Sequence, residues 1–167
     1  MKKILFILCI VSIISCKSKK TASEKKTMHV EEPEKVANIK SRYEKIDLKL
    51  VNYQKLTKAY SLGKRLLETC NTSKFKVFTK EEATDKVIKN ATVEKISKTC
   101  QKILIRNGKF IDLDLIEVTQ DNETDDLSFR YKIVYEKKYF ERELYIIINS
   151  DGKVSGMKTK ELPKKPM

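Results

Sequence analysis

The chain has 167 residues, of which 40% are hydrophobic and 35% are charged, and its net charge is +13. This length leaves room for one modest domain and excludes a second hydrophobic core once polar terminal segments are set aside. The single histidine, His29, lies in a polar N-terminal segment, which excludes a Ser-His-Asp triad or a Cys-His pair in the folded part. No catalytic residue, metal site or cofactor is predicted, because P-loop, GxGxxG, HExxH and EF-hand spacings do not occur.

The positive charge does not form a nucleic-acid signature. Lys and Arg total 36 against 23 Asp and Glu, but the two signs are interleaved along the chain. An arginine-rich helix, zinc-finger spacing and an RNP-like aromatic pattern are all missing from the sequence. We therefore favour a lysine-rich solvated surface next to an anionic membrane over nucleic-acid binding.

Residues 1–15 have the pattern of an export signal. Lys2 and Lys3 precede an apolar run from Ile4 to Ile14, which is shorter than the about 20 residues that span a bilayer. The segment from Ile13 to Cys16 resembles the lipobox of bacterial lipoproteins, in which the cysteine is acylated before cleavage. The resemblance implies a mature chain that begins at lipidated Cys16 and is anchored to the cell membrane or outer membrane. An ordinary signal peptide and an uncleaved anchor are the alternatives.

Residues 16–42 are predicted to be the lipidated cysteine and a flexible charged tether. Lys, Glu, Ser and Thr dominate this segment, and Pro33 interrupts it. Some bacterial lipoproteins that reach the cell surface resemble one another in having acidic residues after the cysteine, whereas Lys17, Lys19 and Lys20 are basic. We therefore expect the domain to face the periplasm.

A single domain is predicted over residues 43–162, followed by a tail over residues 163–167, and its first half is helical. Apolar residues at helical spacing predict a first helix from Tyr53 to Cys70, with a start as early as Tyr43 as an alternative. Thr79, followed by acidic residues, predicts the N-cap of a second helix that runs to about Lys89. Thr92 predicts the cap of a third helix, which ends at Gly108.

Beyond Gly108 the apolar period changes to that of strands. The predicted strands are Phe110–Val118, Leu127–Glu136, Tyr139–Asn149 and Val154–Glu161. A two-residue connection at Lys137 and Lys138 would place Tyr131 opposite Leu144 on the core face. The same register would place Lys132 opposite Glu143 on the other face, where the two charges pair.

Three helices followed by a four-stranded antiparallel meander predict an α+β fold, in which about three N-terminal helices pack on a curved sheet. This order resembles the cystatin-like cone of the nuclear transport factor 2-like superfamily, in particular its small exported bacterial members of unassigned function. The resemblance covers about residues 53–161, and its most recognisable segment is the turn and strand from Asn149 to Met157. The superfamily's enzymes lead one to expect acidic, histidine or tyrosine groups inside the cone.

Two cysteines, Cys70 and Cys100, remain in the domain after Cys9 leaves with the signal and Cys16 takes the lipid. In an oxidising compartment two thiols can pair. We predict a Cys70–Cys100 disulfide, because both residues lie near the ends of predicted helices, where the chain can turn them together. Two buried free cysteines are the alternative.

The remaining carboxylates and tyrosines of the domain can have either a functional or a purely structural role. Asp112 and Asp114 share one face of a strand, which can raise one carboxyl pKa, but a solvated face that pairs with lysines is favoured. The acidic segment 121–126 lacks the glycine and the final glutamate of a calcium loop, which favours a polar turn. Four tyrosines can either line a ligand pocket or pack. They are Tyr131, Tyr135, Tyr139 and Tyr145.

These features predict a membrane-anchored envelope lipoprotein that is not an enzyme and binds an envelope protein or a small apolar ligand. The alternatives are a small enzyme with a carboxylate and tyrosine pocket, and a structural subunit. An enclosed cavity with polar groups would indicate an enzyme or ligand binder, and an exposed apolar patch would indicate an interaction module.

Replacing the predicted lipid site tests the anchor. Cys16→Ser is expected to abolish incorporation of radiolabelled palmitate and to leave the chain unprocessed or soluble, because serine lacks the thiol that is acylated. Cys9→Ser serves as the control and should keep the label. Equal labelling of the Cys16→Ser chain would contradict the lipoprotein assignment.

Overall fold

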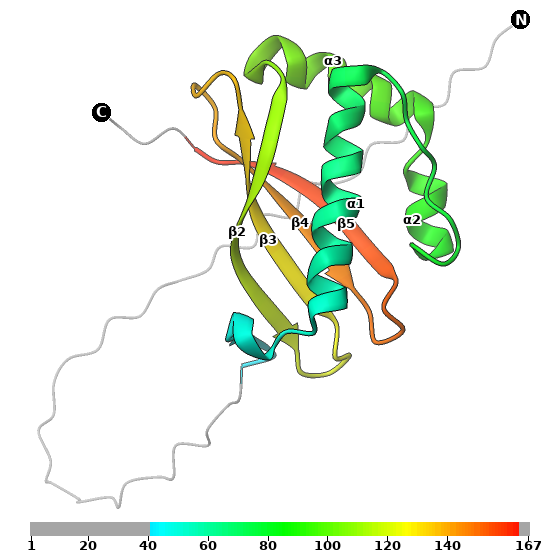
Figure 1. The fold of residues 1–167 in the computed structure, drawn as a ribbon, viewed down its shortest axis with the longest axis vertical. Helices are drawn as coiled ribbons and strands as arrows, with labels where there is room; N and C mark the ends of the chain where they lie inside the picture. The colour runs from blue at the N-terminus through cyan, green and yellow to red at the C-terminus, as the bar shows by residue number, and fades with distance from the viewer. Residues whose placement is uncertain (1–40, 164–167) are drawn as a thin grey trace, which may run out of the picture. The chain divides into compact units, whose positions relative to one another are not determined.

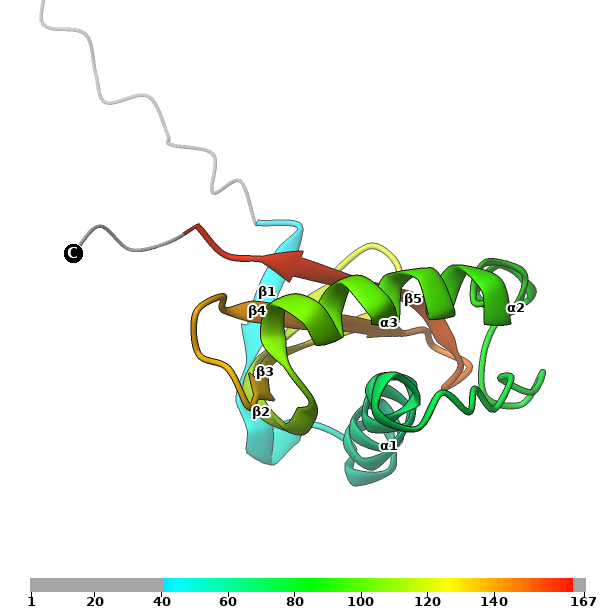
Figure 2. The same cartoon turned by 90° about the horizontal axis from the view of Figure 1, so that it is seen from above.

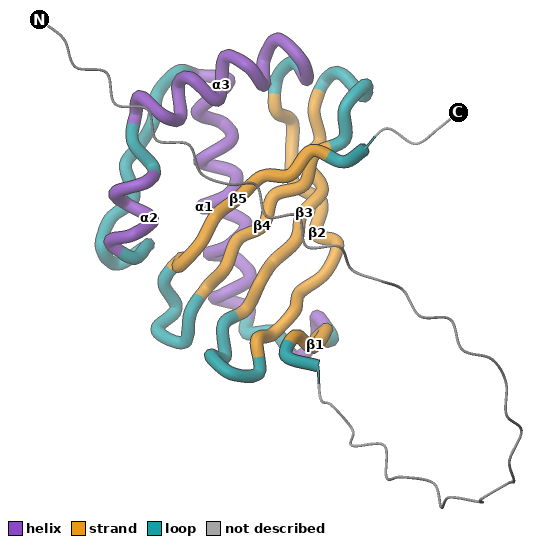
Figure 3. The backbone as a smooth tube through the Cα atoms, turned by 180° about the vertical axis from the view of Figure 1, so that it is seen from behind, coloured by secondary structure: helices purple, strands orange, loops and turns teal. Residues whose placement is uncertain are grey.

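The computed structural model describes residues 41–163, so Cys16, the predicted signal and residues 17–40 of the predicted tether lie outside the described residues. The described residues form an α+β fold with a five-stranded antiparallel sheet in the order β1-β2-β3-β4-β5. The elements are β1 (Tyr43–Ile46), a 3-10 helix (Leu48–Leu50), α1 (Tyr53–Thr72), α2 (Asp85–Asn90), α3 (Val93–Asn107), β2 (Phe110–Asp121), β3 (Leu127–Tyr135), β4 (Arg142–Ile148) and β5 (Val154–Glu161). The helices lie on one side of the sheet (Figure 1), and no helix crosses the strands in the view from behind (Figure 3).

Local sequence signals determine the ends of α1 and α3. Asn52 precedes α1, and its side chain accepts a hydrogen bond of 2.8 Å from the backbone of Gln54. Thr92 caps α3 by accepting from the backbone of Lys95 at 3.4 Å. Gly108, with a φ of 73°, ends the helix in a conformation that glycine adopts without strain. The predicted start and end of the third helix are therefore confirmed.

The predicted start of the second helix at Thr79 is wrong, because α2 begins at Asp85. Thr79 does open a short turn, in which its N–H donates to the Glu82 carboxylate at 2.9 Å. The turn stops because the backbone then pairs with β5. The Val154 N–H donates to the Glu82 carbonyl at 2.9 Å, and the Thr84 N–H donates to the Val154 carbonyl at 3.0 Å. A continuous helix would need these same backbone groups.

The prediction of four strands missed β1, and the alternative of a helix that starts at Tyr43 is wrong. Tyr43–Ile46 pairs antiparallel with the last residues of β2. Arg42 fixes this edge strand by donating to both carboxylate oxygens of Asp121, the shortest contact measuring 2.8 Å, and by an ion pair of 2.9 Å with Glu123. The hydrogen bond from Arg42 lowers the pKa of Asp121. The acidic turn between β2 and β3 thus holds β1 in place.

The predicted register of β3 and β4 is confirmed, with Tyr131 opposite Leu144 and Lys132 opposite Glu143. The connection is longer than the predicted two residues, since β3 ends at Tyr135 and β4 begins at Arg142. The expected ion pair is also replaced. Lys132 lies 3.9 Å from Glu141, whereas Glu143 accepts a hydrogen bond of 2.7 Å from Tyr145.

Helix α1 packs closely on the sheet at Gly63. A Cβ atom at this position would lie 2.6 Å from Ile146 Cδ1 and 2.9 Å from Leu144 Cδ2. The buried face of the helix continues on both sides of the glycine through Ala59 and Leu67. The hydrophobic core therefore lies between α1 and the middle strands of the sheet.

A salt bridge joins the turn at residues 79–84 to α1. Both terminal nitrogens of Arg65 donate to the Glu82 carboxylate, at 2.8 and 2.7 Å, and each side chain is 24% exposed. These bonds lower the pKa of Glu82 from 4.5 to about 2. The folded state therefore favours the ionised carboxylate more strongly than the unfolded chain does.

The stability that Glu82 contributes should depend on pH. It is fully present above the unfolded pKa of 4.5 and is lost as the pH falls towards the folded pKa of about 2. Glu82→Gln should lower the free energy of unfolding by about 2 kcal/mol at pH 7, after allowance for solvent screening. Urea unfolding at pH 7, 4.5 and 2 would measure this loss, which should shrink between pH 4.5 and 2. Glu68→Gln on the exposed side of α1 is the control, and an equal loss at every pH would contradict the assignment.

Candidate functional site

An apolar cavity of 170 Å³ lies between α1, α3 and the strands β4 and β5. Its apolar lining includes Leu66, Ile96, Cys100, Ile103, Leu144 and Met157. The polar residues at its border are two threonines and one lysine, Lys158. A cavity of about 150 Å³ with such a lining can hold a benzene-sized apolar group.

A second cavity of 400 Å³ adjoins the first and extends towards α2. The two cavities share Leu66, Ile96 and Met157, and the second is also bordered by Val87 of α2 and Gly156 of β5. We call the two together the β5 cleft. These lining residues were not predicted as site residues, because each has the apolar pattern of an ordinary core position.

The cleft exists because α3 is held to the rest of the domain mainly through its C-terminal half. The buried residues of α3 are Cys100, Ile103 and Asn107, and Asn107 donates through its side-chain amide to the Phe140 carbonyl at 2.9 Å. Arg106 adds an ion pair of 2.8 Å with Glu161 of β5. Figure 2 shows α3 passing over the end of the sheet where β4 and β5 lie. The N-terminal half of α3 is largely exposed, so the space beneath it stays open.

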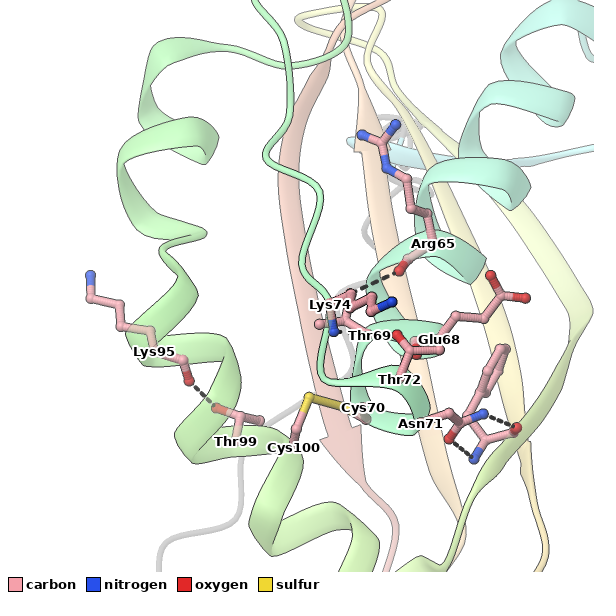
Figure 4. Close-up of a disulfide and its surroundings, with 11 residues drawn as sticks. Arg65, Glu68, Thr69, Cys70, Asn71, Thr72, Lys74, Lys95, Thr99 and Cys100 are labelled. Atoms are coloured by element: carbon pink, nitrogen blue, oxygen red, sulfur yellow. Dashed lines mark hydrogen bonds between the residues drawn. A yellow bond between two sulfur atoms is a disulfide. The ribbon is translucent and has the colours of Figure 1, made fainter.

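The predicted disulfide between Cys70 and Cys100 is confirmed, with a Cα–Cα distance of 4.7 Å. Cys70 lies in the last turns of α1 as expected, but Cys100 lies in the middle of α3 and not at its end. Figure 4 shows this link between the two helices. Both cysteines border the smaller cavity, so the disulfide fixes the wall of the cleft.

The structure does not bring the predicted pocket tyrosines together. Tyr131 and Tyr135 are 1% and 4% exposed and belong to the core, where burial raises the pKa of Tyr131 and raises that of Tyr135 to about 12. Tyr145 lies on the opposite face, beside Arg130 in the sheet register, and Tyr139 is exposed in the β3–β4 connection. Tyr135 borders a separate polar cavity of 280 Å³ at that connection. None of these tyrosines lines the β5 cleft.

Asp112 forms a tyrosine–carboxylate pair outside the cleft. It accepts a hydrogen bond of 2.7 Å from the Tyr60 hydroxyl and lies 3.6 Å from Lys64, while Asp114 is exposed. The bond from Tyr60 lowers the pKa of Asp112 and raises the pKa of Tyr60. This is the lysine-paired surface carboxylate that the sequence favoured.

A second pair, Glu143 and Tyr145, lies on the face of the sheet opposite the helices. The hydrogen bond between them raises the pKa of Tyr145. Neither pair borders the β5 cleft.

Residues 41–163 contain neither a metal-binding cluster nor a membrane-spanning helix. In this part of the chain, no group of three or more His, Cys, Asp or Glu side chains is placed to hold a metal ion. The described helices are also too short or too polar to cross a membrane. Comparison of the chain with protein-family models, curated proteins and solved structures finds no match.

Removing the disulfide should destabilise the domain. Cys70 and Cys100 are 30 residues apart, and closing a loop of that size stabilises a fold by about 3.5 kcal/mol through the lost entropy of the unfolded chain. Cys70→Ala combined with Cys100→Ala should lower the free energy of unfolding by about this amount in urea. The wild-type chain measured in a reducing agent should show a similar loss. Alkylation of both thiols in the denatured, non-reduced chain would contradict the disulfide.

Proposed function

We propose that this protein is a cell-envelope lipoprotein, acylated at Cys16, whose domain faces the periplasm and binds an apolar group of an envelope component or small ligand in the β5 cleft. The observation that carries the proposal is the chemistry of the cleft. Its lining is apolar, its border carries lysine, and the described carboxylate–tyrosine pairs lie elsewhere. Such a surface suits binding by burial of apolar area and not proton transfer.

The fold is consistent with this proposal. We propose that the domain is a small cone of the nuclear transport factor 2-like type, in which helices cover one face of a curved antiparallel sheet. The order of helices before the β2–β5 meander supports the assignment. The β1 strand is an addition to the pattern that the sequence predicted.

The proposed site differs from the cone interior that the resemblance led one to expect. The interior between α1 and the middle strands is filled by Tyr131, Phe129, Leu144 and Ile146, each at most 1% exposed. Space for a ligand lies instead at the β5 side of the sheet. This location favours a binding module over the alternative of a carboxylate and tyrosine enzyme.

An apolar dye tests the cleft. The purified full chain should bind N-phenyl-1-naphthylamine with a saturable rise in fluorescence, and Ile96→Glu should weaken this binding about tenfold or more, because a carboxylate is costly to bury. Ile105→Glu is the matched control, since Ile105 lies on the same helix, is 76% exposed and does not border the cleft. Equal dye binding by all three chains would contradict the proposal.

A further inference from the structure

Strand β5 leaves one backbone edge free beside the cleft. In the sheet order, β5 is an edge strand whose other side pairs with β4. The Leu162 N–H donates to the Glu141 carbonyl at 2.9 Å, and this bond sets the alternation of the antiparallel ladder. By that alternation, the N–H and C=O groups of Met157 and Thr159 point away from β4. No hydrogen bond from another described residue reaches these backbone groups.

The same edge already accepts a backbone partner at its beginning. Residues 82–84 form a parallel bridge in which Ala83 pairs with Val154. The Glu82 carbonyl and the Thr84 N–H make the two hydrogen bonds of this bridge. The chain then turns into α2, so the bridge ends before it reaches Met157. An extended segment that continued along the edge would meet unpaired groups at Met157 and Thr159.

The two cavities border consecutive residues of β5. Ser155 and Gly156 border the larger cavity, Thr159 borders the smaller one, and Met157 borders both. Side chains on one face of a strand recur at about 6.8 Å, twice the rise per residue. Two alternate apolar side chains of an added strand can therefore enter the two cavities on either side of Met157.

Lysines near the cleft indicate that the ends of a bound segment are acidic. Lys86 borders the larger cavity and is exposed, and Lys158 and Lys160 are exposed along β5. The Lys158 side chain lies on the face opposite the helices, with its Nζ 4.8 Å from the centroid of the Tyr145 ring, so the positive charge follows the edge of β5. The nearest carboxylate on β5, Glu161, is already paired with two arginines. The border is therefore positive and attracts an acidic partner.

These observations discriminate between occupants. An acyl chain would fill the cavities but would cover the Met157 and Thr159 backbone groups without bonding them, which is unfavourable. A second copy that paired through β5 would bring lysines of the same strand together. An extended peptide satisfies the backbone groups, the cavities and the positive border together.

We infer that the partner of the β5 cleft is an extended peptide segment of another envelope protein, with alternate apolar residues and acidic ends, which pairs with β5 as a sixth strand. This inference rests on the proposed function, because it uses the same cleft. It adds that recognition is made by the backbone of β5 as well as by the apolar lining.

The probe is a fluorescein-labelled nine-residue peptide in which five alternating Ile and Thr residues are flanked by two Asp at each end. Its binding to the purified full chain is measured by fluorescence anisotropy. Two further peptides carry N-methyl groups on alternate amides, one on each set. Because only one set of amides faces β5 in a paired strand, one methylated peptide should bind at least about tenfold more weakly, and the other should bind like the parent.

Variants of Thr159 test the same backbone group from the protein side. Thr159→Pro removes the free N–H and should bind at least about fivefold more weakly than Thr159→Ala, which keeps this N–H. Both variants lose the same contact from Arg142 to the threonine hydroxyl, so this contact cancels in the comparison. If Thr159→Pro does not fold, hydrogen exchange of the wild-type Met157 and Thr159 amides provides the readout. Both amides should exchange more slowly when the peptide is bound.

The outcomes separate this inference from the proposed function. Equal binding of both methylated peptides, or unchanged exchange at Met157 and Thr159, overturns strand pairing. Failure to bind the peptide while N-phenyl-1-naphthylamine still binds overturns the inference and leaves the proposed function standing, and displacement of the dye by palmitate would then identify an acyl ligand. Loss of both dye and peptide binding overturns both.

Discussion

The close approach of α1 to β4 at Gly63 determines where everything else in the domain can lie. Any side chain at this position would overlap the ends of Leu144 and Ile146, both of which are fully buried. The helix therefore sits low over the middle of the sheet and excludes solvent from it. One helix is too narrow to cover all the strands of the sheet. The β5 side is therefore covered by α2 and α3, which leave cavities between themselves and the strands.

The disulfide and the β5 cleft are two results of this arrangement. Helix α3 has few buried residues, so apolar burial alone gives it little attachment to the sheet. Cys70 and Cys100 attach it covalently to α1, and Asn107 holds its last turn through the Phe140 carbonyl. The opposite end of α3, near Ile96, has no such attachment of its own among the described contacts and stands over the cleft. The same connections that attach α3 to the domain thus leave the β5 cleft open.

Elements of the fold that local signals determine were predictable from the sequence, whereas elements that depend on distant contacts were not. Thr92, Gly108 and the alternation of β3 and β4 are local signals, and the structure confirms each of them. Strand β1 was not predicted, because Tyr43–Ile46 is short and almost wholly exposed and only its pairing with β2 defines it as a strand. The break before α2 likewise depends on a bond to Val154, about seventy residues away in the chain. In β2, two register shifts leave Ile111 exposed and Val118 fully buried, which a strict period of two counted from Leu113 does not predict.

The residues of the candidate site were harder to predict from the sequence than the elements of the fold. The predicted register already placed Tyr145 on the face opposite Tyr131, so the separation of these tyrosines followed from the sequence itself. The position of the β5 cleft did not follow from the sequence. Leu66, Ile96 and Met157 come from three different elements, and their apolar side chains differ from core residues only in being incompletely covered. An apolar pattern indicates that a side chain is shielded from water, but it does not identify the neighbour that covers it. Where a neighbouring helix covers an apolar side chain only in part, that side chain borders a cleft. Incomplete cover of this kind is visible only in three dimensions.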